Sequence, residues 1–419
     1  MKKILVLCMS HISYGETRMG LSLARQLVAA GFDVHLMGEV YSEGILRSSG
    51  MPYTLFSRMY GLPSDYILDD LINNKKPDLI ILADYFIYSQ MHRGGLNAGP
   101  WTILDYGIPV IPIDCWEWNE TNMLVDVYFD EKKTMPIDAK IFEMPAYLRP
   151  IPFCHLPDKS CPKAFHYHLY EPNIESGQGD KKWLRESLGL RDCDKIIMMT
   201  QSTWQDDCDY DMLARKSENI FSLICYYIDK LPENVFMLIV GDVSETKILN
   251  NKRLLVRPRC DPSVFNRIVL SVDMLLSLNI SSTALTYAVN NHIPAIALTN
   301  NCNYICLQDV ERFAETNKGG EYVVKWLRNN IPFYKFRLFP WGLYELMEAV
   351  CKDNQYFKCF EQINVLNEQE IIRTMHETIF CKKHKSGLLA CQETYRRQVA
   401  LLDGTVESFY KMMDYVGVQ

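Results

Sequence analysis

The chain has 419 residues, which is more than one hydrophobic core usually supports, so two domains are expected. Hydrophobic residues make up 48% and charged residues 23% of the chain, values that exclude a disordered or fibrous protein. Its 51 acidic residues outnumber its 44 basic ones and give a net charge of -7, which argues against nucleic acid as a partner.

The cysteines and the apolar runs indicate where the protein works. The 14 cysteines are spread along the chain without the clustering of a disulfide framework, so we expect a reducing, cytoplasmic compartment. The apolar run at residues 4–9 is too short for a signal peptide. No run approaches the about 18 apolar residues of a membrane span, so no transmembrane segment is expected. Peripheral contact with a membrane is left open.

The first part of the chain alternates short apolar runs with helix-sized intervals. Residues 3–9 form a continuous apolar run, which is typical of a strand buried on both faces of a sheet. Apolar residues then recur every four positions from Met19, which predicts a helix. A second strand from residue 33 completes a strand–helix–strand unit, and two more apolar runs end at Asp84 and Asp114.

The pattern is interrupted once and then restarts. Prolines and a polar tract between residues 150 and 194 indicate a connector, with a short helix near 181–188. Five further apolar runs follow, separated by helix-sized intervals. The segment from about 386 to 417 is predicted to be helical and broken at Gly404.

We therefore predict an α/β protein with two Rossmann-like, doubly wound parallel sheets facing a cleft, and a C-terminal helix that crosses back. The predicted divisions are a first domain at 1–150, a connector at 151–193, a second sheet domain at 194–385, and helices at 386–419 that pack on the first domain. Ligands of such sheets bind beyond the carboxyl ends of the strands, so the site is expected in the cleft.

The densest local signal is the sequence LSLNISSTALTYAVNNHIPAIALT in the second domain. A strand ends at Leu278, a turn follows, and Ser282 is a suitable N-cap for a helix. The free amides of the first helical turn, with the hydroxyls of Ser281, Ser282 and Thr283, form a pattern that can hold a phosphate. Hydroxyls that only cap a helix are the alternative interpretation.

The order of these elements resembles that of the GT-B glycosyltransferases, which transfer a sugar from a nucleotide donor. The donor-binding half of that family carries a stretch like "aDlvvshgGsgTtlEal..GvPvv.lP", and residues 271–299 match it in order and spacing. The segments 238–242 and 253–275 are similar to the strand and loop that precede it in the family. At the N-terminus, residues 6–38 are similar to the family's "gHv.r...LA..L..rGHeV.l".

This resemblance implies an enzyme that moves a sugar from a nucleotide-diphosphate donor to an acceptor hydroxyl or a similar nucleophile. A UDP-sugar is the favoured co-substrate, with no tightly bound cofactor or metal, and the reaction is expected to invert the anomeric centre. Two departures bear on the donor. The paired glycines of the family are replaced by Asn279 and Ile280, and the glutamate that grips the donor ribose falls on Thr286, which lacks its charge-assisted acceptors.

The resemblance also places a catalytic pair in the first domain. His11 follows the first strand, where inverting members of the family carry a general base, and Asp84 matches the aspartate that orients it. An imidazole with a pKa of about 6.5 can accept a proton at neutral pH, and a carboxylate stabilises the imidazolium. Glu16 and Asp114 are rival bases, and Glu16 also suits a helix-dipole role.

Further residues of the second domain are expected to bind the donor because they follow the ends of its strands. These candidates, with those of the 279–283 turn, are Ser202, Thr203, Gly241, Arg259, Asn279, Ser281, Ser282, Thr283 and Asn303. In the first domain, Trp116, Trp118 and Tyr85 are candidates for stacking on an acceptor, with core packing as the alternative.

Two other interpretations compete with this one. Cys154, His155, Cys161, His166 and His168 lie within fifteen residues and have the donor types of a zinc site. Their spacing fits no familiar finger, and a connector with interface histidines is the preferred interpretation. At the level of function, the alternatives are a sugar-nucleotide epimerase of the same fold and an inactive nucleotide-binding or scaffold relative.

Overall fold

The computed structural model describes residues 1–10, 14–57, 64–89, 99–119, 121, 123–128, 131–157, 161–170, 179–200, 211–241, 251–316 and 318–418. His11, Ser202 and Thr203 lie outside these described residues.

Five described strands form a first sheet, all parallel, in the order β3-β2-β1-β4-β5. They are β1 (Lys3–Cys8), β2 (Asp33–Glu39), β3 (Tyr53–Phe56), β4 (Leu79–Leu82) and β5 (Val110–Pro112). Side chains of β1 alternate between two clusters of buried residues, with Val6 in one and Leu7 in the other. The prediction of a strand buried on both faces is therefore confirmed, whereas the half-buried edge strand β3 was not predicted.

Six described strands form a second parallel sheet, in the order β12-β11-β10-β13-β14-β15. They are β10 (Lys195–Thr200), β11 (Val235–Val240), β12 (Leu254–Arg257), β13 (Met274–Ser277), β14 (Ala295–Thr299) and β15 (Glu361–Asn364). The first five correspond to the five apolar runs of the sequence. The sequence did not reveal β15, because its residues EQIN are mostly polar and it lies at the sheet edge.

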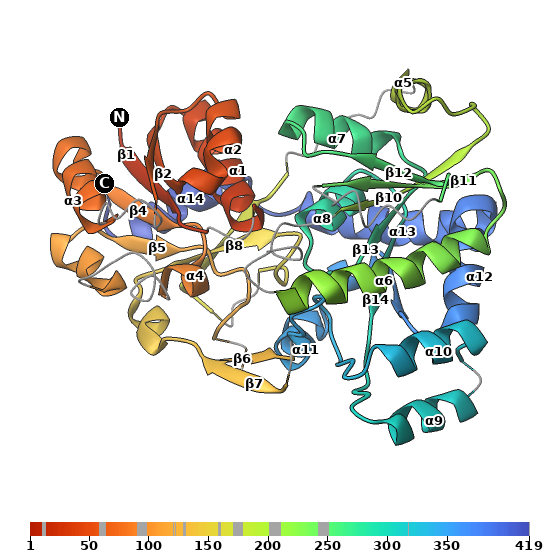
Figure 1. The fold of residues 1–419 in the computed structure, drawn as a ribbon. Coiled ribbons are helices and arrows are strands. Elements are labelled where there is room, and N and C mark those ends of the chain that lie inside the picture. The colour runs from red at the N-terminus through yellow and green to blue at the C-terminus, as the bar shows by residue number, and fades with distance from the viewer. Residues whose placement is uncertain are drawn as a thin grey trace.

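Helices cover both sheets, as Figure 1 shows. Around the first sheet they are α1 (Gly15–Ala29), α2 (Glu43–Ser48), α3 (Ser64–Lys75) and α4 (Tyr85–Ser89). Around the second they are α5 (Gly179–Ser187), α6 (Asp211–Asp229), α7 (Pro262–Ser271), α8 (Thr283–Asn290), α9 (Leu307–Glu315), α10 (Glu321–Asn329), α11 (Tyr344–Cys351), α12 (Glu368–Phe380) and α13 (Lys382–Val399). We call each sheet with its helices the first and the second lobe. The fold is the α/β architecture of two doubly wound parallel sheets.

The last helix, α14 (Thr405–Tyr415), returns to the first lobe. Phe409, Met412 and Met413 of α14 are buried in the same cluster as Val6 of β1. Both chain ends therefore lie in the first lobe, which confirms that the C-terminal helix crosses back.

Two small sheets lie in the first lobe beside its main sheet. Strands β6 (Leu124–Val127) and β7 (Lys133–Pro136) are antiparallel, and β8 (Tyr147–Ile151) and β9 (Ala164–His168) are parallel. Asp126 of β6 reaches the second lobe, where its carboxylate accepts hydrogen bonds from the backbone amides of Tyr344 at 2.7 Å and Leu346 at 2.8 Å. The first turn of α11 is thus held by a residue of the other lobe.

Candidate functional site

A cavity of about 840 Å³ lies between the lobes. Its wall includes residues that follow carboxyl ends of strands in both sheets, which is where ligands of such sheets bind. The polar members from the first lobe are Tyr14, Glu16, Arg18 and Asp84, and those from the second are Thr200, Arg259, Cys260, Asp261, Asn279, Ser281, Ser282 and Thr283.

The first lobe brings two carboxyl groups to this cavity. Asp84 follows β4 and is buried, and its Oδ1 accepts a hydrogen bond from the Ile87 amide at 2.7 Å, so it also caps α4. Glu16 lies in the first turn of α1. Burial raises the pKa of Asp84 to about 7, and the negative charge of Glu16 adds to the rise. This pair can therefore hold and release a proton near neutral pH.

Asp114, the other rival base, is not part of the cavity wall. Its carboxylate accepts hydrogen bonds from the Trp118 amide at 3.1 Å and from Arg149 Nε at 3.3 Å. Burial raises its pKa to about 6 while the Arg149 charge opposes the rise. Asp114 is therefore engaged in an internal ion pair rather than facing a substrate.

The turn at residues 279–282 is built without glycine. Asn279 Oδ1 accepts hydrogen bonds from the Ser281 amide at 2.8 Å and from its hydroxyl at 2.7 Å, and none of the four residues has a positive φ. Ile280 is fully buried in the core of the second lobe. The backbone here does not need the conformational freedom of glycine.

The turn leads directly into α8, whose N-terminus faces the cavity. Ser282 occupies the N-cap position as predicted, but its side chain makes no capping hydrogen bond. Ser281, Ser282 and Thr283 line the cavity. The first amides of a helix lack intrahelical partners and carry its positive dipole end, so this corner suits an anion.

Thr286, which takes the place of the family's glutamate, points into the protein. It is fully buried, and its hydroxyl donates to the Thr283 carbonyl at 2.8 Å. The Tyr170 hydroxyl donates to the same carbonyl at 2.6 Å. Because Thr286 is absent from the cavity wall, it makes no direct contact with a ligand there.

Gly241 and Arg259 both line the cavity, from the ends of β11 and β12. Gly241 has a φ of 152°, a conformation that side chains disfavour. Arg259 Nη1 donates to the hydroxyl of Tyr14 at 3.0 Å and to that of Tyr41 at 3.3 Å, and the two tyrosine rings stack at 4.8 Å. Arg259 thus connects the second lobe to the first. The sequence suggested neither tyrosine.

Asn303 does not line the cavity. Its Oδ1 accepts a hydrogen bond from the Lys335 amide at 2.8 Å, so the side chain organises a loop of the second lobe. The neighbouring Asn300 is buried and donates to the carbonyls of Cys302 and Tyr334. The interpretation of Asn303 as a donor-binding residue is therefore not supported by its position.

Aromatic side chains form the apolar part of the wall in the first lobe. Trp116 and Trp118 line the cavity, and Phe86 and Phe153 join them. Trp118 is only 1% exposed and belongs to a core cluster of the first lobe, so core packing accounts for it. Phe153 packs edge-on against Trp116 with ring centroids 5.8 Å apart. Tyr85, the third predicted residue, lies in the core, stacks on Trp101 and donates to the Asp138 carbonyl at 2.8 Å.

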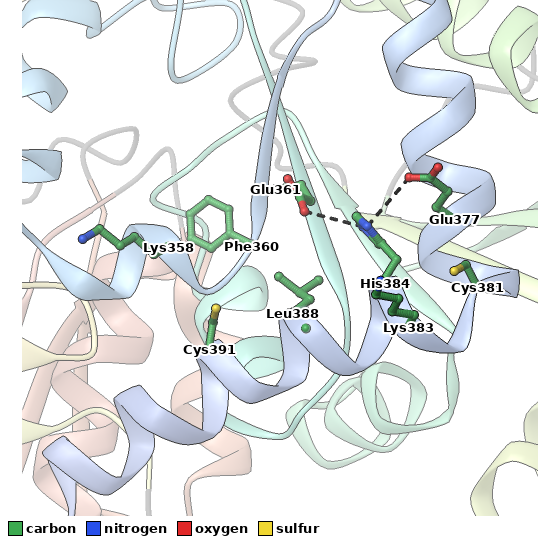
Figure 2. A pocket seen from close by; sticks show the side chains of 10 residues that line it. Lys358, Phe360, Glu361, Glu377, Cys381, Lys383, His384, Leu388 and Cys391 are labelled. Atoms are coloured by element: carbon green, nitrogen blue, oxygen red, sulfur yellow. Dashed lines mark ion pairs between the residues drawn. The ribbon is translucent and has the colours of Figure 1, made fainter.

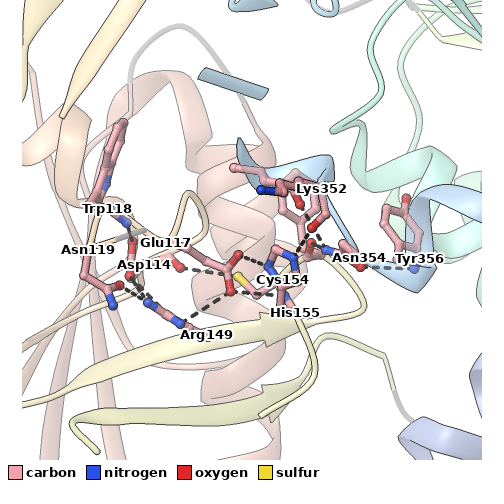
Figure 3. Close-up of polar contacts among 12 residues, drawn as sticks. Asp114, Glu117, Trp118, Asn119, Arg149, Cys154, His155, Lys352, Asn354 and Tyr356 are labelled. Atoms are coloured by element: carbon pink, nitrogen blue, oxygen red, sulfur yellow. Dashed lines mark hydrogen bonds and ion pairs between the residues drawn. The ribbon is translucent and has the colours of Figure 1, made fainter. Parts of the chain in front are cut away.

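A buried charge network lies behind this wall (Figure 3). Glu117, between the two tryptophans, has a positive φ of 51° and pairs with Arg149 at 3.4 Å. It also accepts hydrogen bonds from the amide and ring of His155, whose Nε2 donates to the Lys352 carbonyl of the second lobe at 2.6 Å. The hydrogen bond to Glu117 raises the pKa of His155 to about 9, so the imidazolium joins the lobes.

Candidate metal ligands of the connector are hydrogen-bonded to other groups of the protein. Cys154 is buried, and its thiol contacts the Asp114 carbonyl at 3.4 Å. His166 and His168 both direct Nε2 to the Asp403 carbonyl, at 3.0 and 2.9 Å. Among the described residues, no three His, Cys, Asp or Glu side chains gather so as to hold a metal ion.

A second, smaller pocket of about 460 Å³ lies on the second lobe beside α12 and α13. Figure 2 shows His384 between two carboxylates, with Nε2 3.5 Å from Glu361 and Nδ1 3.8 Å from Glu377. Each ring nitrogen faces a different carboxylate, so these groups do not converge on one ligand.

In the part of the chain that the structure describes, the helices are all too short or too polar to cross a membrane.

Three solved structures have similar folds at low sequence identity. Spinosyn forosaminyltransferase SpnP is 14% identical, with a TM-score of 0.57 and 99% of each chain covered. HepE from Anabaena in complex with UDP-glucose is 9% identical, with a TM-score of 0.55 and 100% of each chain covered. A protein from Listeria monocytogenes described as a UDP-N-acetylglucosamine 2-epimerase is 10% identical, with a TM-score of 0.51, covering 93% of this chain and 90% of the other.

These likenesses establish a diverged GT-B fold. No curated protein matches the chain. A family of unknown function, DUF6365, matches residues 23–417, and the chain therefore belongs to that family.

Proposed function

We propose that this protein is a glycosyltransferase that moves a sugar from a nucleotide-diphosphate donor to an acceptor hydroxyl or similar nucleophile. One observation carries the proposal: a single cavity opposes the carboxyl pair Glu16 and Asp84 of the first lobe to the N-terminus of α8 in the second. The first arrangement suits proton transfer and the second suits a diphosphate. The fold relative in complex with UDP-glucose supports a UDP-sugar as the favoured donor.

The donor would bind against the second lobe. The first-turn amides of α8 and the hydroxyls of Ser281 and Ser282 would receive the diphosphate, and Gly241 would leave room for the nucleoside. In this scheme the charge that develops on the departing diphosphate is stabilised by fixed dipoles, without a requirement for a divalent cation. Turnover should accordingly persist in the presence of EDTA.

The acceptor would bind against the first lobe, with Trp116 in its apolar wall. A base removes the proton of the acceptor hydroxyl, and the oxygen attacks the anomeric carbon. The bond from that carbon to the diphosphate oxygen breaks, and its electron pair leaves with the nucleotide. A single displacement of this kind inverts the anomeric configuration, so a product with retained configuration would contradict it.

His11 is the base that the family resemblance implies, with Asp84 as its partner, and Glu16 is the rival. Because the pKa of Asp84 is about 7, this group can exchange a proton near neutral pH with whichever of the two residues is the base. If His11 is the base, His11→Ala abolishes transfer and Glu16→Gln retains most of it. If Glu16 is the base, Glu16→Gln causes the loss, expected to be about 100-fold or more. If both variants retain the activity of the wild type, neither His11 nor Glu16 is the base.

Nucleotide binding is the first test of the function. We expect calorimetry to detect binding of at least one of UDP, dTDP and GDP, and a Ser281→Ala, Ser282→Ala double variant to bind it more weakly. Thr394→Ala, an exposed threonine on α13, is the matched control and should bind like the wild type. If no nucleotide binds, the enzyme proposal fails and a scaffold role is favoured.

A sugar-nucleotide epimerase is the second candidate, favoured by the pair of carboxyl groups and by the fold relative described as such an epimerase. Two acid–base groups at one cavity can remove and return a proton at a sugar carbon. Incubation with UDP-sugars but no acceptor separates the candidates. An epimerised nucleotide sugar would identify this activity, whereas an unchanged donor would count against it.

A further inference from the structure

Arg18 is a cationic residue of the cavity wall whose charge has no counter-ion among the residues that the structure describes. It lies in α1 of the first lobe, it is only partly exposed, and it lines the cavity. Its guanidinium lies over the ring of Phe265, a residue of α7 in the second lobe, 4.6 Å from the ring centroid. Among the described residues, its side chain forms no hydrogen bond and no ion pair.

The surroundings of Arg18 make this lack of a counter-ion costly. Burial lowers the pKa of Arg18, which means that its charge is removed from water without full compensation. Contact with the Phe265 ring face returns only part of that energy. A bound anion would restore the missing hydrogen bonds, because a guanidinium presents several donors that match phosphate oxygens.

Arg18 also lies near the helix terminus already assigned to the anion. Its closest electrostatic neighbours include Tyr170, and the Arg18 charge opposes the burial that raises the pKa of Tyr170 to about 12. The Tyr170 hydroxyl in turn donates to the carbonyl of Thr283, the first residue of α8. A guanidinium from one lobe and a helix N-terminus from the other are thus brought to the same part of the cavity.

We propose that Arg18 binds the diphosphate of the donor from the first lobe, so that both lobes hold the leaving group. This rests on the proposed function of the cavity as a nucleotide-sugar site. When the bond to the anomeric carbon breaks, the electron pair remains on the diphosphate oxygen, and Arg18 neutralises the charge formed there.

Calorimetry with a nucleoside diphosphate, its monophosphate and its nucleoside tests this role. For the base that binds best, Arg18→Met should weaken diphosphate binding about 10- to 100-fold and leave nucleoside binding unchanged. The diphosphate affinity of Arg18→Lys should lie between those of the wild type and Arg18→Met, because lysine keeps the charge but lacks the planar guanidinium. Arg25→Met, at an exposed position of the same helix, is the matched control and should bind like the wild type.

The outcomes separate this inference from the function on which it rests. Equal diphosphate affinity of wild type and Arg18→Met would overturn the role of Arg18 and leave the transferase proposal intact. If the wild type binds no nucleotide, inorganic pyrophosphate becomes the probe. Weaker pyrophosphate binding by Arg18→Met than by the wild type would support Arg18 as an anion ligand. Equal binding by the two proteins, or no binding by the wild type, would overturn that role. If Arg18→Met fails to fold, Arg18→Lys decides, with unchanged affinity counting against the proposal.

Discussion

Asp126 in the first lobe accepts a hydrogen bond from the backbone amide of Leu346 in the second lobe at 2.8 Å. The same carboxylate also accepts from the amides of Tyr344 and Glu345, so one side chain satisfies three free donors at the start of α11. The lobes are therefore joined at this edge of the cavity by a helix cap that crosses between them.

Replacing Asp126 should loosen that junction. Asp126→Ala leaves three amides without their acceptor, and we expect the free energy of unfolding to fall by about 2 kcal/mol. Hydrogen exchange at the first-turn amides of α11 should accelerate. Asp105→Ala, at an exposed position, is the control. Unchanged exchange in Asp126→Ala would contradict the role of this cap.

Asp84 should make stability depend on pH. Its folded-state pKa, about 7, lies above its usual 3.8, so ionisation destabilises the folded protein, with no cost below pH 3.8 and the full cost above pH 7. Asp84→Asn removes this cost and keeps an acceptor for the Ile87 amide. Relative to wild type, this variant should gain roughly 4 kcal/mol between pH 4 and pH 8 in urea denaturation.

The control for this experiment is Asp70→Asn, at an exposed position of α3. Its stability difference from wild type should be the same at both pH values. If the difference between Asp84→Asn and wild type is equally independent of pH, the carboxyl group is not held in the protonated form by its surroundings.

Glu117 should control the charge of His155. Glu117→Gln leaves Arg149 and His155 with a weaker partner in a buried setting, and the loss of stability should be about 3 kcal/mol. The pKa of His155, about 9 in the wild type, should fall toward 6.5, as NMR titration of the ring would detect. Glu186→Gln, an exposed substitution on α5, should change neither quantity.

The sign of the linked pH effect follows from the raised pKa. The Glu117–His155 pair stabilises the wild type fully below pH 6.5, and this stabilisation is lost as the pH rises through about 9. Glu117→Gln should show a smaller change over that range. An unaltered His155 titration in the variant would show that the charge of His155 has another cause.

Thr286→Glu should not restore the family's ribose contact. Thr286 is fully buried beside Tyr170 and away from the cavity wall, so a glutamate there places a carboxylate in the core. We expect a loss of several kcal/mol in thermal denaturation, against about 1 kcal/mol for Thr286→Val. A stable Thr286→Glu protein with tighter nucleotide binding would contradict this orientation.

The sequence was most informative where a local pattern is sufficient. A run buried on both faces of a sheet must be apolar throughout, which is why β1 could be predicted from residues 3–9 and β14 from IPAIALT. The turn at 279–282 and the N-terminus of α8 were predicted for the same reason, because a strand end, a hydroxyl-rich turn and a helix follow one another directly. The sequence did not reveal the half-buried β3 or the polar β15.

Side-chain direction and partners across the cavity required the tertiary structure. Asn303 and Tyr85 have the residue types of ligand-binding positions, but one organises a loop and the other packs in the core. Arg18 and Phe265 lie far apart in the chain and meet only because the two lobes face each other.

The sequence alone was thus sufficient to predict the two parallel sheets and the ends of their strands, because these features depend on residues close together in the sequence. The position of Asp126 against α11, and of Arg18 beside the cavity, was decided only by the docking of the lobes. Such contacts join residues separated by hundreds of positions, and their formation depends on the shape of both surfaces rather than on any local pattern.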